Sequence, residues 1–345
     1  MQNFISGIQQ IGIGVKDAPE SLRYYANLFG MDTLVFNDVS EAYLMSHYTG
    51  GKVYKRQALL SLNMHGGGGF ELWQFQNRLP VKPLQHPQYG DLGIYAAKLK
   101  SPDVVKAHSQ FLSLNHVVTS PLLSDEKGEA HFFVLDKEEN NFNIVPGNHW
   151  FQQKGGGMGG VTGAVIGVSD VEQSKIFYQW LLCIPDVVYD KTILGEDGQR
   201  YRKVVLHKQP ATQGAFARLL GSIELELVQC LDRQPAKIYE NRFWGDYGFI
   251  HLCFDVYDMD GLKRYALDNG YSFTVDSKDS FQMETASGRF CYMEDPDGTL
   301  IELVETHKVP ILKKLGLHLN LRKRGLAKPL PDWMIKLLAV SKVKM

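Results

Sequence analysis

Hydrophobic and polar residues alternate in short runs along the chain, and segments with helical spacing separate these runs. "QIGIGV" (10–15) and "AVIGV" (164–168) have the alternation typical of strands. Asp17 and Asp170 follow them, and aspartate favours the N-cap position of a helix. Further strand-like runs come next, "ALLSLN" and "FELWQF" in the first half and "KVVLHK" and "IELELVQ" in the second. The pattern predicts a strand, a helix and then several strands in each half.

The two halves of the chain also resemble each other in sequence, and each half divides again into two similar parts. The matching segments are "IGVKDAPESLRYYANLFGM" (13–31) with "IGVSDVEQSKIFYQWLLCI" (166–184), "FELWQ" (70–74) with "LELVQ" (225–229), and "GDLGIYAA" (90–97) with "GDYGFIHL" (245–252). Such internal similarity indicates a repeated structural unit. We therefore predict four βαβββ modules in an α+β fold. The predicted modules span 4–79, 86–147, 161–232 and 245–306.

This division gives the predicted domain organisation. The first two modules form a domain over 4–150, and the last two form a domain over 161–306. The Gly-rich segment 151–160, which contains "KGGGMGG", is expected to be the linker between them. Residues 307–345 form a separate basic tail.

Composition narrows the functional classes. The chain has 345 residues and a formal net charge of −1, which argues against a nucleic-acid partner. Its four cysteines are single and lack CxxC spacing, so we expect neither a disulfide framework nor a structural zinc site. No run is long and apolar enough to span a membrane, and the first residues do not resemble a signal peptide, so the expected location is cytoplasmic. "GIG" (12–14) lacks a third glycine, so no nucleotide cofactor is expected.

The segment "GRFCYMEDPDGTLIELVE" (288–305) closes the fourth module. Together with the four-module plan, it resembles the vicinal oxygen chelate superfamily, which includes glyoxalases, bleomycin-resistance proteins and extradiol dioxygenases. The resemblance covers about residues 4–306. It implies two cupped mixed-sheet domains of the glyoxalase type, in which metal ligands on the first and last strands of each module point into the cup.

The ligand positions implied by this resemblance hold different residues in the four modules. In chain order they are Gln10 and Glu71, Ala96 and Asn143, Gly163 and Glu226, and His251 and Glu302. Histidine, glutamate and a glutamine carbonyl suit a divalent metal such as Zn, Ni, Mn or Fe(II). Alternation along a strand places His251 opposite to Ile250, and Glu302 opposite to Ile301. Both side chains are therefore expected on the same concave face.

Two pairings of the modules are compatible with the sequence. If neighbours pair, Glu226, His251 and Glu302 share a cup; this arrangement is the more common one and is favoured. If the first module pairs with the fourth, Gln10, Glu71, His251 and Glu302 converge instead. Gln9 precedes Gln10, and simple alternation allows only one of them to face the cup.

The predicted function is that of a metal-dependent enzyme acting on a small oxygenated substrate. The resemblance implies a glyoxalase-like isomerase or lyase, or a dioxygenase-like enzyme, with Glu302 as ligand and general base. Tyr292 is a possible acid or substrate contact, with core packing as the alternative. Arg289 could hold an anionic substrate or cap a hairpin. Ring cleavage by iron is disfavoured, because Gly163 stands where the first histidine of its triad is expected.

A metal-free small-molecule binding or sequestering protein, of the bleomycin-resistance type, is the alternative function. Ala96 and Gly163 support this alternative, because neither residue offers a side-chain ligand for a metal. The retention of His251 with Glu302 argues against it.

The tail 307–345 contains ten lysines and arginines and a single acidic residue, Asp332. Its apolar residues alternate with basic ones, which predicts two short amphipathic helices joined by "AKPLP" (327–331). The tail is expected to pack across its own domain with its basic side outward. The alternative is weak, reversible contact with an anionic membrane surface. The sequence leaves the oligomeric state open.

Overall fold

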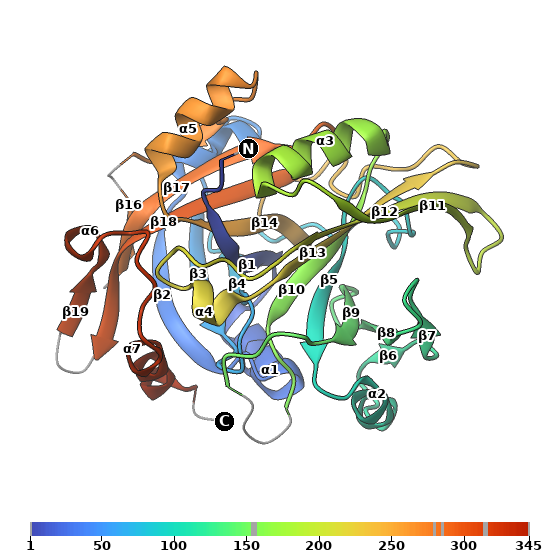
Figure 1. The fold of residues 1–345 in the computed structure, drawn as a ribbon, viewed down its shortest axis with the longest axis horizontal. Helices are drawn as coiled ribbons and strands as arrows, with labels where there is room; N and C mark the ends of the chain where they lie inside the picture. Colours follow the sequence, from blue (N-terminus) through green and yellow to red (C-terminus); the bar gives the residue numbers. More distant parts are fainter. Residues whose placement is uncertain (1, 153–156, 279–280, 284–285, 313–316, 344–345) are drawn as a thin grey trace.

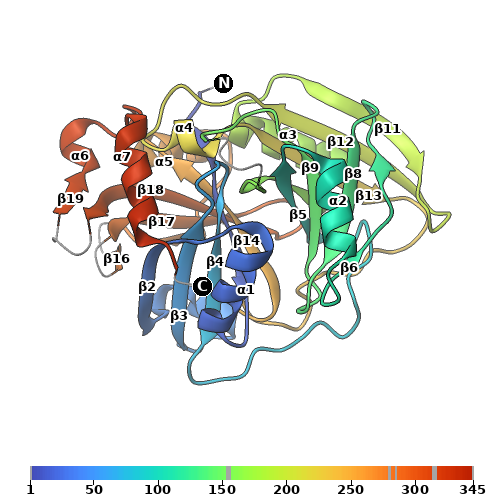
Figure 2. The same ribbon diagram turned by 90° about the horizontal axis from the view of Figure 1, so that it is seen from below.

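The computed structural model describes residues 2–152, 157–278, 281–283, 286–312 and 317–343. Most strands belong to two mixed sheets, and the few helices lie outside them (Figures 1 and 2). The predicted α+β fold is confirmed. The element order also follows the four predicted strand–helix–strand modules. Four residues of the predicted linker, 153–156, lie outside the described residues.

The first sheet combines the blue strands from the beginning of the chain with the orange and red strands from its end (Figure 1). Its main path runs β15-β17-β18-β14-β1-β4-β3-β2, and β16 and β19 pair with β17 and β18. The bounds are β1 Ile5–Gly14, β2 Thr33–Glu41, β3 Lys55–Leu62, β4 Gly69–Phe75, β14 Gly248–Val256, β15 Val275–Asp276, β16 Phe281–Met283, β17 Ala286–Glu294, β18 Leu300–Leu312 and β19 Leu317–Asn320.

The second sheet contains the strands of the middle of the chain. Its main path runs β11-β12-β13-β10-β5-β9-β8-β6, and β7 pairs with β8. The bounds are β5 Gly93–Ser101, β6 Val118–Thr119, β7 Leu123–Ser124, β8 Ala130–Leu135, β9 Asn141–Pro146, β10 Val161–Gly167, β11 Val187–Leu194, β12 Arg200–Lys208 and β13 Ile223–Cys230.

This strand order corrects the favoured pairing of neighbouring modules. β1 of the first module lies antiparallel to β14 of the fourth, from Ile5 opposite Val256 to Gly14 opposite Gly248. The third module pairs with the second, through β10 and β5. After β4, residues 76–92 carry the chain across to β5 in the other sheet. Strand patterns do not distinguish these arrangements, because the edge of a first strand offers the same backbone donors and acceptors to either partner.

Two of the helices form hydrogen bonds with the next module along the chain, although the strands of the two modules are in different sheets. The long helices are α1 Ala18–Phe29, α2 Val104–Leu112, α3 Val171–Leu182 and α5 Met259–Asp268. Tyr25 of α1 donates a hydrogen bond to Asp136 of the second module at 2.6 Å, and Tyr178 of α3 donates one to Asp295 of the fourth at 2.9 Å. The largest apolar core lies between the two sheets and includes both tyrosines.

The predicted helix caps are confirmed. The Asp17 side chain accepts a hydrogen bond from the Glu20 N–H, and Asp170 accepts from the N–H groups of Glu172 and Gln173. In "DPDG", Gly298 has a φ of 88°, which favours glycine.

The tail packs across the first sheet, as expected. It contains α6 Leu321–Arg324, α7 Asp332–Lys336 and the 3₁₀ helix η3 Leu337–Ser341, which contacts β2 and β18. Leu321, Leu330, Ile335 and Leu338 are buried in an apolar cluster with residues of the first sheet. The segment between α6 and α7 contains "AKPLP", as predicted, while β19 adds a strand that was not predicted. No helix among the described residues is long and apolar enough to cross a membrane.

Candidate metal centre

The exchanged pairing brings Glu71 of β4, His251 of β14 and Glu302 of β18 together on the concave face of the first sheet. The Nε2 atom of His251 lies 3.3 Å from Oε2 of Glu71 and 3.1 Å from Oε2 of Glu302. All three residues are buried, and one ligand atom from each lies within 4.8 Å of the others. A cluster of one imidazole and two carboxylates is a donor set that suits a divalent metal.

Gln10 of β1 completes this group. Its Nε2 donates hydrogen bonds to Glu302 at 3.2 Å and to Glu71 at 3.4 Å. Its Oε1 is buried without a hydrogen-bond partner among the described residues. An unpaired buried acceptor is unfavourable, so this oxygen is available to a ligand. Gln9 also lines the cavity above, because the register of β1 shifts between Ile8 and Gln10; the expectation that only one glutamine faces the cup was wrong.

Two neighbours orient the imidazole of His251. The Tyr292 hydroxyl lies 3.1 Å from Nδ1, so the other ring nitrogen, Nε2, faces the carboxylates. Gly12 on β1 faces the ring from the adjacent strand. A Cβ atom at this glycine would lie 2.4 Å from Cε1 and 2.5 Å from Nε2 of His251. Only glycine leaves room for the ring here, and a glycine inside a strand is a sequence feature that could have indicated this close approach.

His251 and Glu302 shift each other's pKa. Burial alone would lower the pKa of His251, but Glu302 and Glu71 raise it to about 9. Burial would raise the pKa of Glu302, whereas the charge of His251 lowers it. Burial also raises the pKa of Tyr292 well above its ordinary value, so this hydroxyl remains protonated. Two buried carboxylates beside one imidazole leave an excess of negative charge that a divalent cation would neutralise.

A cavity of about 420 Å³ lies over this cluster. Gln10, Glu71 and Glu302 provide polar groups in its lining, and most other lining residues are apolar. The volume is in the range usual for small-molecule sites. The cluster is therefore buried, preorganised and accessible to a small ligand.

Comparison with known proteins agrees with this arrangement. Residues 164–309 match the family model described as the glyoxalase/bleomycin resistance protein/dioxygenase superfamily. This match lies in the third and fourth modules and supports the resemblance to the vicinal oxygen chelate superfamily. No curated protein matches it by sequence.

Three solved structures share the fold over most of the chain. A variant of glyoxalase I from Zea mays has a TM-score of 0.56 at 15% identity, covering 87% of this chain and 93% of that one. Glyoxalase I from Zea mays has a TM-score of 0.54 at 14% identity, covering 87% and 92%. A putative dioxygenase from Bacillus subtilis has a TM-score of 0.52 at 16% identity, covering 88% and 86%. At these identities the likeness shows the fold alone.

The second sheet forms a cup like that of the first, but with a different set of side chains in it. Glu226 lies in this sheet and not beside His251, so the predicted set of Glu226, His251 and Glu302 is wrong. Lys98 binds Glu226 at 2.9 Å, Lys203 binds it at 3.1 Å, and the Tyr89 hydroxyl donates to it at 2.8 Å. Burial alone would raise the pKa of Glu226, but the two lysines hold it well below its usual range. Glu226 is therefore ionised and already neutralised by protein cations.

The other implied ligand positions of the second cup offer little to a metal. Ala96 and Gly163 have no side-chain ligand atom. The Oδ1 atom of Asn143 lies 3.1 Å from Nδ1 of His131. Sequence reasoning missed Lys98, although it follows Ala96 by two residues and so lies on the same strand face.

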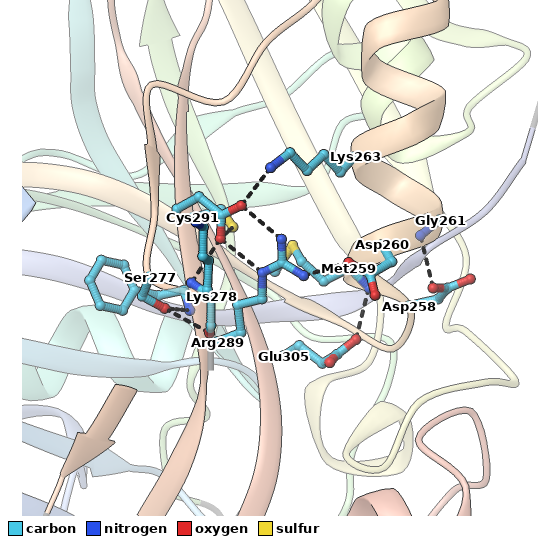
Figure 3. A network of polar contacts seen from close by, with 12 residues as sticks. Asp258, Met259, Asp260, Gly261, Lys263, Ser277, Lys278, Arg289, Cys291 and Glu305 are labelled. Atoms are coloured by element: carbon cyan, nitrogen blue, oxygen red, sulfur yellow. Dashed lines mark hydrogen bonds and ion pairs between the residues drawn. The ribbon is translucent and has the colours of Figure 1, made fainter. Parts of the chain in front are cut away.

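Arg289 does not line the cavity. Its guanidinium donates to Asp276 at 2.9 and 2.7 Å and to Asp260 of α5 at 2.6 Å (Figure 3). Because side chains alternate along β17, Tyr292 faces the cup and Arg289 the opposite side. The expected role in holding an anionic substrate is therefore corrected: Arg289 links β17 to α5.

Proposed function

We propose that the protein is a metal-dependent enzyme of the vicinal oxygen chelate type, acting on a small oxygenated substrate as a glyoxalase-like isomerase or lyase. The single observation that supports this most strongly is the buried convergence of Glu71, His251 and Glu302, with Gln10, below an accessible cavity. These residues come from four strands in two distant parts of the chain. Their meeting at one point is not required for packing.

The residues fit a divalent metal, with Zn, Ni, Mn or Fe(II) as the proposed ions. Nε2 of His251 and the carboxylates of Glu71 and Glu302 would hold it, and Gln10 would add its Oε1 after the amide turns its Nε2 away from the two carboxylates. When bound, such a metal would polarise two adjacent substrate oxygens and stabilise negative charge that develops on them. This donor set contains one histidine and two glutamates, and so it differs from the two-histidine, one-carboxylate set typical of iron oxygenases.

The protein groups would orient the substrate and move a proton. Glu302 is the proposed general base, because its carboxylate lies on the cup floor and lines the cavity. Tyr292 also lines the cavity, and its hydroxyl fixes the imidazole through Nδ1. A direct catalytic role for Tyr292 is part of the proposal. The apolar walls would keep water away from the proton that moves.

Elemental analysis of the purified protein by mass spectrometry tests this proposal. We expect about one equivalent of a divalent metal, lost in both His251→Ala and Glu302→Ala. Glu226→Ala is the matched control, because it removes the corresponding glutamate of the other cup and should keep the metal. Absence of metal in the wild type, with no thermal shift on adding any of the four ions, would contradict the proposal.

A metal-free binding or sequestering protein is the second proposed function, and the largely apolar lining of the cavity favours it. It predicts that small apolar compounds stabilise the protein without any metal. It also predicts that the His251→Ala variant binds those compounds as well as the wild type does.

Weak contact between the tail and an anionic membrane surface also remains a proposal. Trp333 is 59% exposed and Val340 64% exposed, on a segment rich in basic residues. Sedimentation with phosphatidylserine vesicles should fall when Trp333 and Val340 are both changed to serine. Deleting the tail would not be a clean test, because Leu330, Ile335 and Leu338 are buried against the first sheet. A cytoplasmic location likewise stays a prediction.

A further inference from the structure

The cavity above Glu71, His251 and Glu302 is closed on one side by parts of the chain that do not belong to the first sheet. The short helix α4 (Ala217–Leu220) belongs to the third module, whose strands are in the other sheet. Its Leu219 and Leu220, the preceding Phe216, and Leu338 of the tail all line the cavity. We call these four residues the roof.

Backbone hydrogen bonds and an ion pair hold the two parts of the roof together. The N–H of Gly214 donates to the carbonyl of Ala327 at 3.0 Å, and the N–H of Leu330 donates to Ala215 at 2.9 Å. Arg218 binds Asp332 at 2.8 Å. The roof is thus a fixed part of the structure, and its buried leucines present hydrocarbon to the cavity.

The wall of the cavity contains a buried cation, and this cation is already neutralised. Arg56 forms an ion pair with Asp38, and its guanidinium lies 4.9 Å from the centre of the Trp73 ring. Lys308, at the outer end of β18, is only half-buried. An anionic substrate body would therefore find no unpaired buried cation along the described part of this wall.

Two indole N–H groups add weakly polar contacts to the same wall. Trp73 and Trp244 both line the cavity, and the centres of their rings are 4.3 Å apart. Neither Nε1 has a hydrogen-bond partner among the described residues, although both side chains are buried. A buried N–H without a partner favours a ligand that brings an acceptor oxygen.

We infer that the substrate is an uncharged, predominantly apolar compound with its pair of adjacent oxygens at one end, and that the roof sets the size of its apolar part. This inference rests on the proposed function for the oxygen end only. The apolar body is recognised by Leu219, Leu220 and Leu338 through burial of hydrocarbon surface. A substrate with a charged or peptide-like body would lose hydration at these residues without compensation.

Binding of three catechols to the full-length protein, with and without one equivalent of Zn²⁺, tests the inference by calorimetry. Catechol, 4-butylcatechol and 3,4-dihydroxyphenylalanine share the two oxygens and differ in the body. We expect 4-butylcatechol to bind at least tenfold more tightly than catechol, with and without metal, because its chain is buried under the roof. The charged amino acid should bind no better than catechol. Equal or tighter binding of the amino acid than of 4-butylcatechol would overturn the inference.

Variants of the roof provide a second test of the inference. Leu338→Trp should weaken 4-butylcatechol binding about tenfold while leaving catechol binding unchanged, which also reports that the site is folded. Leu338→Ala should improve the binding of the longer 4-hexylcatechol relative to the wild type. Val340→Trp, two residues away and exposed, is the matched control and should change neither. Identical effects of the two tryptophan variants, together with no change in Leu338→Ala, would refute a role of the roof.

The comparison of binding with and without Zn²⁺ distinguishes this inference from the proposed function. If the butyl chain improves binding but Zn²⁺ adds nothing for any catechol, the apolar site stands and the metal-dependent function fails. If Zn²⁺ strengthens catechol binding but the butyl chain gives no gain, the metal centre stands and the inferred substrate class fails.

Discussion

The two cups contain a buried glutamate at matching positions of the fold and neutralise it in different ways. Glu71 follows Phe70 in "FELWQ", and Glu226 follows Leu225 in the matching "LELVQ". In the second cup two lysines bind the carboxylate directly. In the first cup the corresponding carboxylate faces a second glutamate, a histidine and a glutamine.

This difference shows what distinguishes a structural ion-pair network from a candidate metal centre within one fold. Burying a carboxylate is costly unless a cation accompanies it. The second cup carries its cations in the chain, and they leave only a small polar cavity of about 120 Å³. Among the residues that the structure describes, no lysine binds the two carboxylates of the first cup, which has the larger, apolar cavity. Only the first cup thus has both unpaired ligand capacity and room for a substrate.

The largest effect is expected from removing Lys98, one of the two lysines that bind Glu226 in the second cup. Lys98→Met would leave Glu226 with one lysine fewer in a buried site and should reduce the free energy of unfolding by about 3–5 kcal/mol. Urea unfolding of the full-length protein measures this change. Lys127→Met is the control, because Lys127 is 46% exposed and lies 3.9 Å from Glu224, so its loss should cost less than about 1 kcal/mol. Equal losses in the two variants would contradict a structural role of the buried network.

The first cup should instead respond to pH through its metal affinity. The pKa of His251 in the metal-free protein is raised to about 9, so below that pH a metal must displace its proton. Affinity should rise with pH, by about tenfold per unit and so about 100-fold from pH 6 to pH 8. Zn²⁺ titrations in buffered competitor measure it. His251→Gln should flatten this dependence, whereas an unchanged slope in that variant would assign the proton to another group.

Crowding the imidazole should weaken the metal site without altering any ligand. Gly12→Ala places a Cβ atom against the His251 ring and should lower metal affinity about 30-fold, since overpacking typically costs about 1–3 kcal/mol. Gly7→Ala on the same strand is a matched control. Its Cβ would meet Leu220 at 2.4 Å, so it should affect stability and the roof but not metal affinity. A normal metal affinity in Gly12→Ala would show that His251 is not a ligand.

The smallest effect is expected at the hydroxyl that orients His251. Tyr292→Phe removes the contact to Nδ1 and should reduce metal affinity about tenfold, as loss of outer-shell partners does. Tyr178→Phe removes another buried tyrosine hydroxyl, the one bound to Asp295, and should leave metal affinity unchanged. If both variants bind metal like the wild type, Tyr292 does not orient the ligand.

Local patterns predicted the elements well, because the forces that form them are local. Asp17 and Asp170 cap their helices as expected, and "DPDG" turns into the strand that carries Glu302. Alternation placed His251 and Glu302 on one face. Both residues are indeed in the cluster, although their metal-binding role stays a proposal.

The pairing and packing of segments far apart in the chain were not predictable in the same way. The pairing of β1 with β14 depends on which distant edge is available, and no residue of β1 encodes that choice by itself. The register shift beside Gln9 breaks the alternation on which the prediction rested. The roof likewise escaped prediction, since Leu338 and Leu219 line the same cavity only after the tail has crossed the first sheet.

The exchange of modules also has a consequence for synthesis on the ribosome. β1 ends at Gly14, and its neighbour β14 begins at Gly248. At translation rates of about 5–20 residues per second, the nascent chain would wait roughly 10–50 s before that partner emerges. Until then one long edge of β1 has no native partner, which is the kind of edge that invites association between chains. The first cup is therefore one of the last parts of the molecule to be completed, and its assembly depends on protection of an early strand by the cell or by the chain itself.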